Sequence, residues 1–182
     1  MPITGPQTVT REDSAVRRDD FVVVRPIQTR WADIDTYSHV NNAVHYELMD
    51  TAVNGWLMEA TGADIRELDA VGWVVETSCR YLAQLHFPTV VDVGIALARL
   101  GRTSVAYRLA LFGEATAPIA VGRFVHVYVG RADHRPAPIP PAVRRALETL
   151  GDDLAASERP PGAPDPGPDA DVTQPSTTYR RG

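Results

Sequence analysis

The spacing of apolar residues changes once along this chain, and that change limits the folds it can adopt. Between residues 43 and 60, apolar side chains recur every three or four positions, which predicts a helix with one apolar face. From residue 75 onward the spacing is two, in the segments 75–81, 91–97, 105–111 and 119–129, which predicts four strands. A further strand over 21–31 precedes the helix, and a short helix over 141–150 follows the strands. The pattern therefore predicts an α+β domain built on one long helix and a sheet of about five strands.

Both ends of the long helix carry recognisable signals. Asn41 or Asn42 can cap its N-terminus, and Gly62 can take the left-handed conformation that ends a helix. A tight turn at Gly101–Thr103 predicts a hairpin, and we expect the four later strands to follow one another as a meander. A helix of about 18 residues is roughly 27 Å long, close to the width of five strands at about 4.8 Å each. One sheet can therefore wrap the helix, and a second copy of the chain in a symmetric dimer is the simplest cover for the other sheet face and the edges.

The two ends of the chain lack the periodicity of the middle. Residues 1–20 mix small, polar and charged types, so we expect a flexible arm that buries little apolar surface. Residues 151–182 contain six prolines between positions 160 and 175 and almost no large aliphatic side chains, which predicts a disordered tail. The predicted domain therefore spans residues 21–150.

Composition removes several classes of function. All 18 basic residues are arginine, so Schiff-base chemistry on lysine and the lysine of a phosphate-binding loop are excluded. The net charge of -5 argues against a nucleic-acid or anionic-membrane partner. A single cysteine, Cys79, supports neither a disulfide within the chain nor a multi-thiolate metal site, and no apolar run is long enough to span a membrane. We therefore expect a cytoplasmic protein.

Ionisable and hydrogen-bonding side chains are concentrated between the first strand and the long helix, over residues 30–42. The first turn of a helix has N–H groups without partners and a partial positive charge, so it can stabilise a developing oxyanion without a metal. Asp35 supplies a carboxylate close to that turn in the sequence. The sequence therefore predicts a candidate catalytic site at this junction.

The segment RWADIDTYSHVNNAVHYELMD, residues 30–50, resembles the signature of the hotdog-fold acyl-CoA thioesterases of the hydroxybenzoyl-CoA thioesterase family, which contains D-x-D-x-x-G-H-V-N-N. A weaker correspondence continues through Gly101–Ser104 to the strand with Val125, Val127 and Val129, so the resemblance covers most of the domain and neither end. It implies a hotdog fold, in which a curved antiparallel sheet wraps one central helix. It also implies hydrolysis of an acyl-CoA by a homodimer or homotetramer, with coenzyme A as part of the substrate and no separate cofactor.

The resemblance and the residue types together point to the site residues. The second aspartate of the motif, Asp35, is implied as the catalytic carboxylate, either a nucleophile or a general base that activates water. Backbone N–H groups near Asn41, Asn42 and Ala43 are the expected oxyanion donors, and His39 is either a second catalytic group or a loop-fixing donor. The other residues expected to contact substrate are Tyr46 beside the acyl group, and Arg102, Thr103 and Ser104 near the phosphates of coenzyme A.

The same residues allow other interpretations. An aspartate such as Asp35 can also close a turn by bonding its own backbone. A metal site of His39, His45, Asp35 and Asp50 matches no zinc spacing, so no metal is expected. Ser38 replaces the usual glycine of the family signature, and a positive φ there would strain the loop.

Two other functions are compatible with such a domain. One is binding of an acyl-CoA or small apolar ligand without turnover. The other is hydratase or dehydratase chemistry, which uses a histidine with an acid partner and depends here on His39 lying near Asp35. Outside the motif, we expect Trp56 and Trp73 in the core, and Cys79 buried rather than nucleophilic.

Overall fold

The computed structural model of the chain describes residues 15–151, so most of the predicted arm and nearly all of the predicted tail lie outside the described residues. The elements in chain order are η1 (Arg18–Asp20), β1 (Val23–Gln28), η2 (Trp31–Asp33), α2 (Asn42–Thr61), β2 (Ala70–Tyr81), β3 (Val90–Leu100), β4 (Ser104–Phe112), β5 (Pro118–Gly130) and α3 (Pro141–Glu148). The strands and both α-helices lie within a few residues of the predicted ranges.

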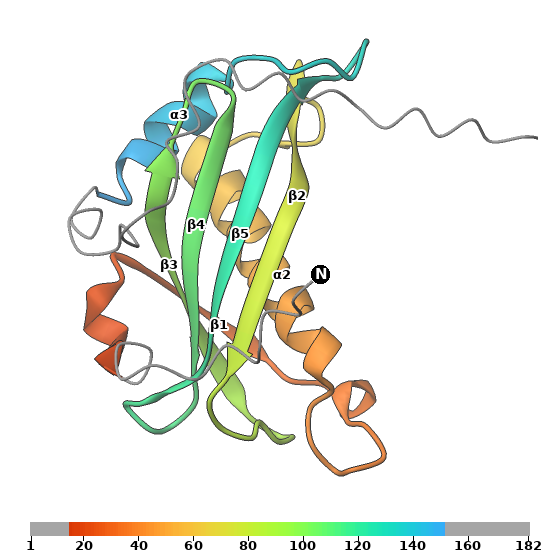
Figure 1. Ribbon diagram of the computed structural model, residues 1–182, viewed down its shortest axis with the longest axis vertical. Coiled ribbons are helices and arrows are strands. Elements are labelled where there is room, and N and C mark those ends of the chain that lie inside the picture. Colours follow the sequence, from red (N-terminus) through yellow and green to blue (C-terminus); the bar gives the residue numbers. More distant parts are fainter. Residues whose placement is uncertain (1–14, 152–182) are drawn as a thin grey trace, which may run out of the picture.

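The strands form one antiparallel sheet, in the order β1-β3-β4-β5-β2. Helix α2 crosses one face of this curved sheet, and α3 lies at the end of the sheet near the C-terminus of α2 (Figure 1). The structure therefore confirms an α+β hotdog fold with five strands and one long central helix.

The prediction of a four-strand meander was wrong for β2. Strands β3, β4 and β5 do follow one another, but β2 pairs with β5 at the opposite edge from β1, and β3 pairs with β1. After β2 the chain does not turn back as a hairpin, and the N–H groups of Leu82 and Ala83 still donate to Ile119 O of β5. An alternating pattern sets which face a residue occupies, but it does not set which strand is its neighbour.

The core lies between α2 and the sheet. Helix α2 begins at the cap predicted for it, since Asn41 Oδ1 accepts a hydrogen bond from Ala43 N–H, and it ends at Gly62 with φ of 63°. Its buried face includes Met49, which packs over Gly122 of β5 so closely that a Cβ at Gly122 would lie 2.7 Å from the Met49 sulfur. The prediction that Trp56 belongs to the core is confirmed, at 7% exposed.

Residues 16–21 cover part of the outer face of the sheet. The Phe21 ring meets the Phe112 ring edge-on at 5.8 Å, and Arg18 forms an ion pair with Asp92 at 2.7 Å. Val16 packs against the same cluster. The end of the predicted arm is therefore in contact with the domain, because it shields apolar side chains that α2 does not reach.

Strand β2 is a long and apolar edge. It has only β5 as a neighbour in the sheet. Four of its large hydrophobic side chains are exposed: Trp73, Val74, Val75 and Tyr81. The placement of Trp73 in the core was therefore wrong, because a side chain on an edge strand is covered from one side only. No helix within residues 15–151 is long and apolar enough to cross a membrane.

Candidate active site

The residues of the signature form a closed loop directly before α2. Ile34 and Val40 make an antiparallel bridge, Asp35 N–H donates to His39 O, and Asn41 N–H donates to Asp33 O. This loop, residues 33–41, extends from the N-terminal end of α2, at the opposite end of the sheet from α3 (Figure 1).

Asp33 fixes the base of the loop. Its buried carboxylate accepts hydrogen bonds from Arg30 N–H at 2.6 Å and from Arg30 Nε at 2.9 Å, and Arg30 also bonds Glu47 on α2 at 2.8 Å. Burial opposes ionisation of Asp33, but the hydrogen bonds and charge of Arg30 outweigh it and hold the pKa of Asp33 below its usual value. Asp33 is therefore a structural anchor, as a buried and paired carboxylate should be.

Asp35 is half-buried and uses only one of its carboxylate oxygens within the chain. Oδ1 accepts from Tyr37 N–H at 2.8 Å and more weakly from His39 N–H at 3.4 Å, which is the turn interaction considered for this residue. Oδ2 has no partner among the described residues. The turn orients the carboxylate and leaves one of its oxygens without a partner within residues 15–151.

Of the three backbone N–H groups expected as oxyanion donors at the helix start, one has no acceptor among the described residues. Asn41 N–H donates to Asp33 O, and Ala43 N–H donates to the capping oxygen of Asn41, so neither is free. Asn42 N–H has no acceptor within residues 15–151. It is the first helical residue, where an N–H without an intrahelical partner is expected.

Ser38 adopts the left-handed conformation, with φ of 65°. The serine therefore keeps a backbone geometry that glycine adopts without cost, and the loop carries the corresponding strain.

Replacing Ser38 with valine should lower the free energy of unfolding by about 1–2 kcal/mol, because a β-branched side chain is disfavoured at positive φ. Ser38 is exposed, so no packing is lost, and thermal unfolding followed by circular dichroism measures the effect. Thr36→Val is the matched control at an exposed position of the same loop without positive φ. Equal unfolding temperatures for the two variants would show that the backbone at Ser38 is not strained.

Aromatic side chains lie around the loop and the helix start. The His39 ring lies 5.1 Å from the His86 ring, and His86 Nδ1 is 3.3 Å from Ser38 O. Tyr46 stacks on Phe124 at 6.2 Å, while Tyr81 O–H donates to Asn42 O at 3.0 Å. His86 and Tyr81 were not predicted as site residues, because they come from segments distant in the sequence and belong to no motif.

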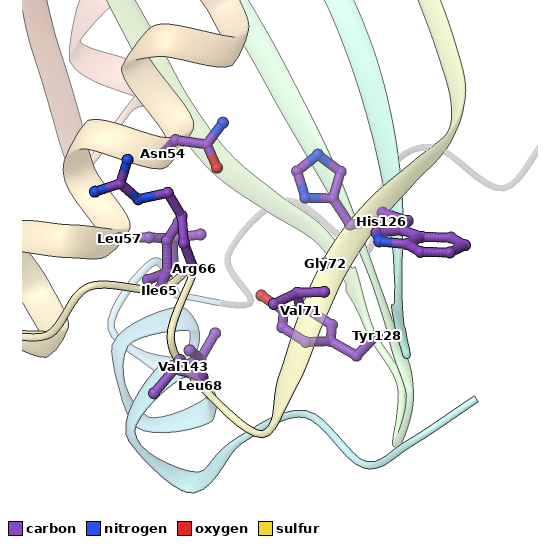
Figure 2. A pocket seen from close by; sticks show the side chains of 11 residues that line it. Asn54, Leu57, Ile65, Arg66, Leu68, Val71, Gly72, His126, Tyr128 and Val143 are labelled. Atoms are coloured by element: carbon purple, nitrogen blue, oxygen red, sulfur yellow. The ribbon is translucent and has the colours of Figure 1, made fainter. Parts of the chain in front are cut away.

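Arg102, Thr103 and Ser104 do not join Asp35 within one chain. Their turn joins β3 to β4 beside α3, where Arg102 O accepts from Ile139 N–H and Thr103 O accepts from Tyr128 N–H. The same end of the fold holds a cavity of about 260 Å³. The cavity is lined by Asn54, Leu57, Ile65, Arg66, Leu68, Val71, Gly72, Trp73, His126, Tyr128 and Val143 (Figure 2). From Asn42 to Asn54 the helix rises about 18 Å, so this cavity is far from Asp35 of the same chain.

The remaining candidates for reactive chemistry contribute little. Burial raises the pKa of the Cys79 thiol, which is the opposite of what activates a nucleophilic cysteine. Within residues 15–151, no three histidine, cysteine or carboxylate side chains are grouped so that they could hold a metal ion.

Comparison with known proteins gives the same fold. Residues 29–147 match the thioesterase-like superfamily. The PA5185 protein from Pseudomonas aeruginosa strain PAO1 is 47% identical, with a TM-score of 0.71 over 74% of this chain and 94% of that chain. A search of curated proteins finds no match.

Two further solved structures are similar. A thioesterase from Thermus thermophilus, solved with coenzyme A and zinc, is 28% identical, with a TM-score of 0.62 over 72% of this chain and 96% of that chain. BH1999 gentisyl-coenzyme A thioesterase is 25% identical, with a TM-score of 0.61 over 69% of this chain and 99% of that chain.

The wrapped central helix and the acidic loop before it define a hotdog-fold enzyme. The chain belongs to the thioesterase-like superfamily and is a thioester hydrolase.

Proposed function

We propose that this protein is an acyl-CoA thioesterase that converts water and an acyl-CoA into a free acid and coenzyme A. One observation carries the proposal: within the part of the chain that the structure describes, neither Oδ2 of Asp35, which a turn holds on the loop before α2, nor the first N–H of α2, at Asn42, has a hydrogen-bond partner. The similar proteins from Thermus thermophilus, solved with coenzyme A, and BH1999, a gentisyl-coenzyme A thioesterase, support the choice of coenzyme A.

Each residue of the loop and the helix start has a separate role in this hydrolysis. Asp35 acts on the thioester as a general base or as a nucleophile. As a base it takes a proton from water, the water oxygen attacks the carbonyl carbon, and the carbon–sulfur bond breaks to release the thiolate, which takes up a proton. Asn42 N–H stabilises the negative charge on the carbonyl oxygen. His39 and Asn41 shape the loop, and Ala43 and Tyr46 border the acyl group.

We also propose that the working form is a homodimer joined through β2. A long, exposed apolar edge strand is a template for pairing, and a second copy can pair with it about a two-fold axis. Antiparallel pairing brings the first residues of β2 in one copy to the last residues of β2 in the other. The first residues line the cavity, and the last, Tyr81, contacts the start of α2.

In such a dimer the partner subunit's Asp35 faces the cavity and the Arg102–Ser104 turn of this chain. That arrangement unites residues that one chain holds at opposite ends, and it gives the arginine turn access to the phosphates of coenzyme A. The two halves of the predicted site then belong to different copies.

Purified protein should release free thiol from a panel of short, medium, long and aromatic acyl-CoAs, followed with a thiol-reactive dye. The same acyl groups on an acyl carrier protein form the second arm, which separates coenzyme A from carrier-protein substrates. Absence of thiol release from every thioester in both arms would overturn the proposal. Among the described residues Asp35 bonds the backbone N–H of His39, and no hydrogen bond or ion pair joins a carboxylate to the His39 ring, so no observation favours a hydratase.

A further inference from the structure

A buried histidine lies in the first turn of α2. His45 is 3% exposed, and its imidazole has no role in the hydrolysis proposed above. Side chains on a helix lean toward the N-terminus, so each one can reach the residue four positions earlier. His45 Nδ1 lies 3.2 Å from Asn41 O in this way. A carbonyl oxygen can only accept a hydrogen bond, so Nδ1 carries the proton and donates it.

The His45 imidazole is neutral at neutral pH. Burial lowers the pKa of His45, and the hydrogen bond to Asn41 O opposes this effect only in part. A neutral imidazole has one N–H, and its other ring nitrogen is an acceptor. The contact with Asn41 O therefore requires the tautomer of His45 that is protonated at Nδ1.

The carbonyl that His45 contacts belongs to the same peptide group as the proposed oxyanion donor. Asn41 O and Asn42 N–H are the two polar ends of one planar trans peptide, and they point in opposite directions. Asn41 O accepts from Val44 N–H at 2.9 Å as well as from His45. Asn42 N–H has no acceptor within residues 15–151. Side chains that hold the carbonyl oxygen therefore also set the direction of this N–H.

A hydrogen bond to a carbonyl oxygen also makes the N–H of the same peptide a stronger donor. Peptide resonance moves electron density from nitrogen to oxygen, and donors at the oxygen increase that shift. Such polarisation is stronger where water is excluded, as it is around a histidine that is 3% exposed. Negative charge that develops beside Asn42 N–H is then stabilised more strongly.

Tyr81 holds the next peptide and the His45 ring. Its O–H donates to Asn42 O at 3.0 Å, and its ring meets the His45 ring edge-on at 5.0 Å with 89° between the planes. Partial burial raises the pKa of Tyr81 to about 12, so the hydroxyl stays protonated and remains a donor. Side chains therefore bond the carbonyls on both sides of the Asn42 N–H, and the aromatic contact between them fixes the imidazole in place.

We propose that His45 is a positioning residue for the oxyanion donor: through Asn41 O it orients and polarises the peptide whose N–H, at Asn42, stabilises the carbonyl oxygen of the thioester. The inference rests on the proposed function, because it assigns His45 to the same hydrolysis. The charge on that oxygen develops only in the transition state. Loss of the imidazole should therefore lower kcat and leave KM nearly unchanged.

Two variants of His45 separate donation from packing. His45→Phe keeps a ring beside Tyr81 but has no donor, and we expect kcat to fall about tenfold with KM within about twofold, less than the loss of about 10²–10³-fold when an oxyanion donor is removed outright. His45→Asn should recover most of kcat. Asparagine can donate to the carbonyl four residues earlier in this helix, as Asn54 Nδ2 does to Asp50 O at 3.0 Å.

Thr61→Val is the matched control at the other end of α2. Thr61 Oγ1 donates to Leu57 O at 2.7 Å, so this change also removes a bond from a side chain to the carbonyl four residues earlier. The carbonyl of Leu57 is far from Asn42 along the helix, and kcat should not change. Thermal unfolding of all three variants shows which of them are folded.

The tautomer of His45 tests the inference without turnover and without a variant. Nitrogen-15 NMR distinguishes protonated from unprotonated ring nitrogens, and at neutral pH we expect the proton on Nδ1. A proton on Nε2 overturns the inference, even if His45→Phe does not fold. A folded His45→Phe protein with wild-type kcat also overturns it, as does a His45→Asn protein that is as slow as His45→Phe. A wild-type protein that hydrolyses no thioester overturns the proposed function itself, so the two failures are distinguishable.

Discussion

Replacing Asp35 with asparagine should reduce the rate of thioester hydrolysis by about 10²–10⁴-fold, the range over which a positioned general base contributes to catalysis. The amide keeps an oxygen that can accept from Tyr37 N–H, so the turn that shapes the loop is retained. It can neither accept a proton from water nor attack a carbonyl carbon as a carboxylate does. The expected change is therefore in kcat, measured by thiol release at saturating acyl-CoA.

The chain offers a matched control for this change. Asp133 lies in an exposed turn at the other end of the sheet, and its Oδ1 accepts from Arg135 N–H two residues later, as Asp35 does from Tyr37 N–H. Asp133→Asn removes the same charge from the same kind of turn and should leave kcat unchanged. If both variants hydrolyse acyl-CoA at the wild-type rate, Asp35 is a turn residue only and the proposed mechanism is wrong.

Placing a carboxylate in the middle of β2 by Val75→Asp should convert the dimer to monomers and reduce hydrolysis by at least about 100-fold, the scale of loss that a misplaced catalytic group causes. Val75 is 60% exposed on the free edge and adjoins Glu76. If the two strands pair about their midpoints, four carboxylates then meet near the axis, and like charges facing each other across strands are destabilising.

Sedimentation or light scattering gives the mass, and far-ultraviolet circular dichroism shows that the monomer is still folded. Val90→Asp is the control, because Val90 is 53% exposed but lies on β3, away from the proposed interface. A Val75→Asp protein that stays dimeric and active would show that β2 is not the contact. A monomer with full activity would show that one chain holds a complete site.

The helices and strands were predictable because their signals are local. Asn41 and Gly62 bracket α2 through hydrogen bonding and backbone freedom that depend on a few neighbouring residues, and the predicted helix differs from the observed one by one residue at each end. The loop before it was also predictable as a site, since its polar residues are contiguous in the sequence. The conformation of Ser38 fits the replacement of a glycine noted there.

The arrangement of the strands was not predictable from the same pattern. Alternation distinguishes the two faces of a strand, but β2 joins the sheet beside β5 rather than β3, and that choice exposes Trp73. The surroundings of the loop and of the helix start were not predictable either, because His86 contacts His39 and Tyr81 contacts Asn42 from segments with no motif.

By itself, the sequence determined the elements, the helix ends, the family signature and the carboxylate that we place at the reacting carbon, because each depends on residues close together in the chain. Only the tertiary structure decided that the Arg102 turn and Asp35 lie at opposite ends, and that His126 and Asn54 share a pocket. It also decided that Asn42, at the start of α2, has an N–H without an acceptor among the described residues. Those relations join residues far apart in sequence, and they are fixed by strand order and by packing between helix and sheet. Neither the strand order nor the packing between helix and sheet can be read from the periodicity of the sequence.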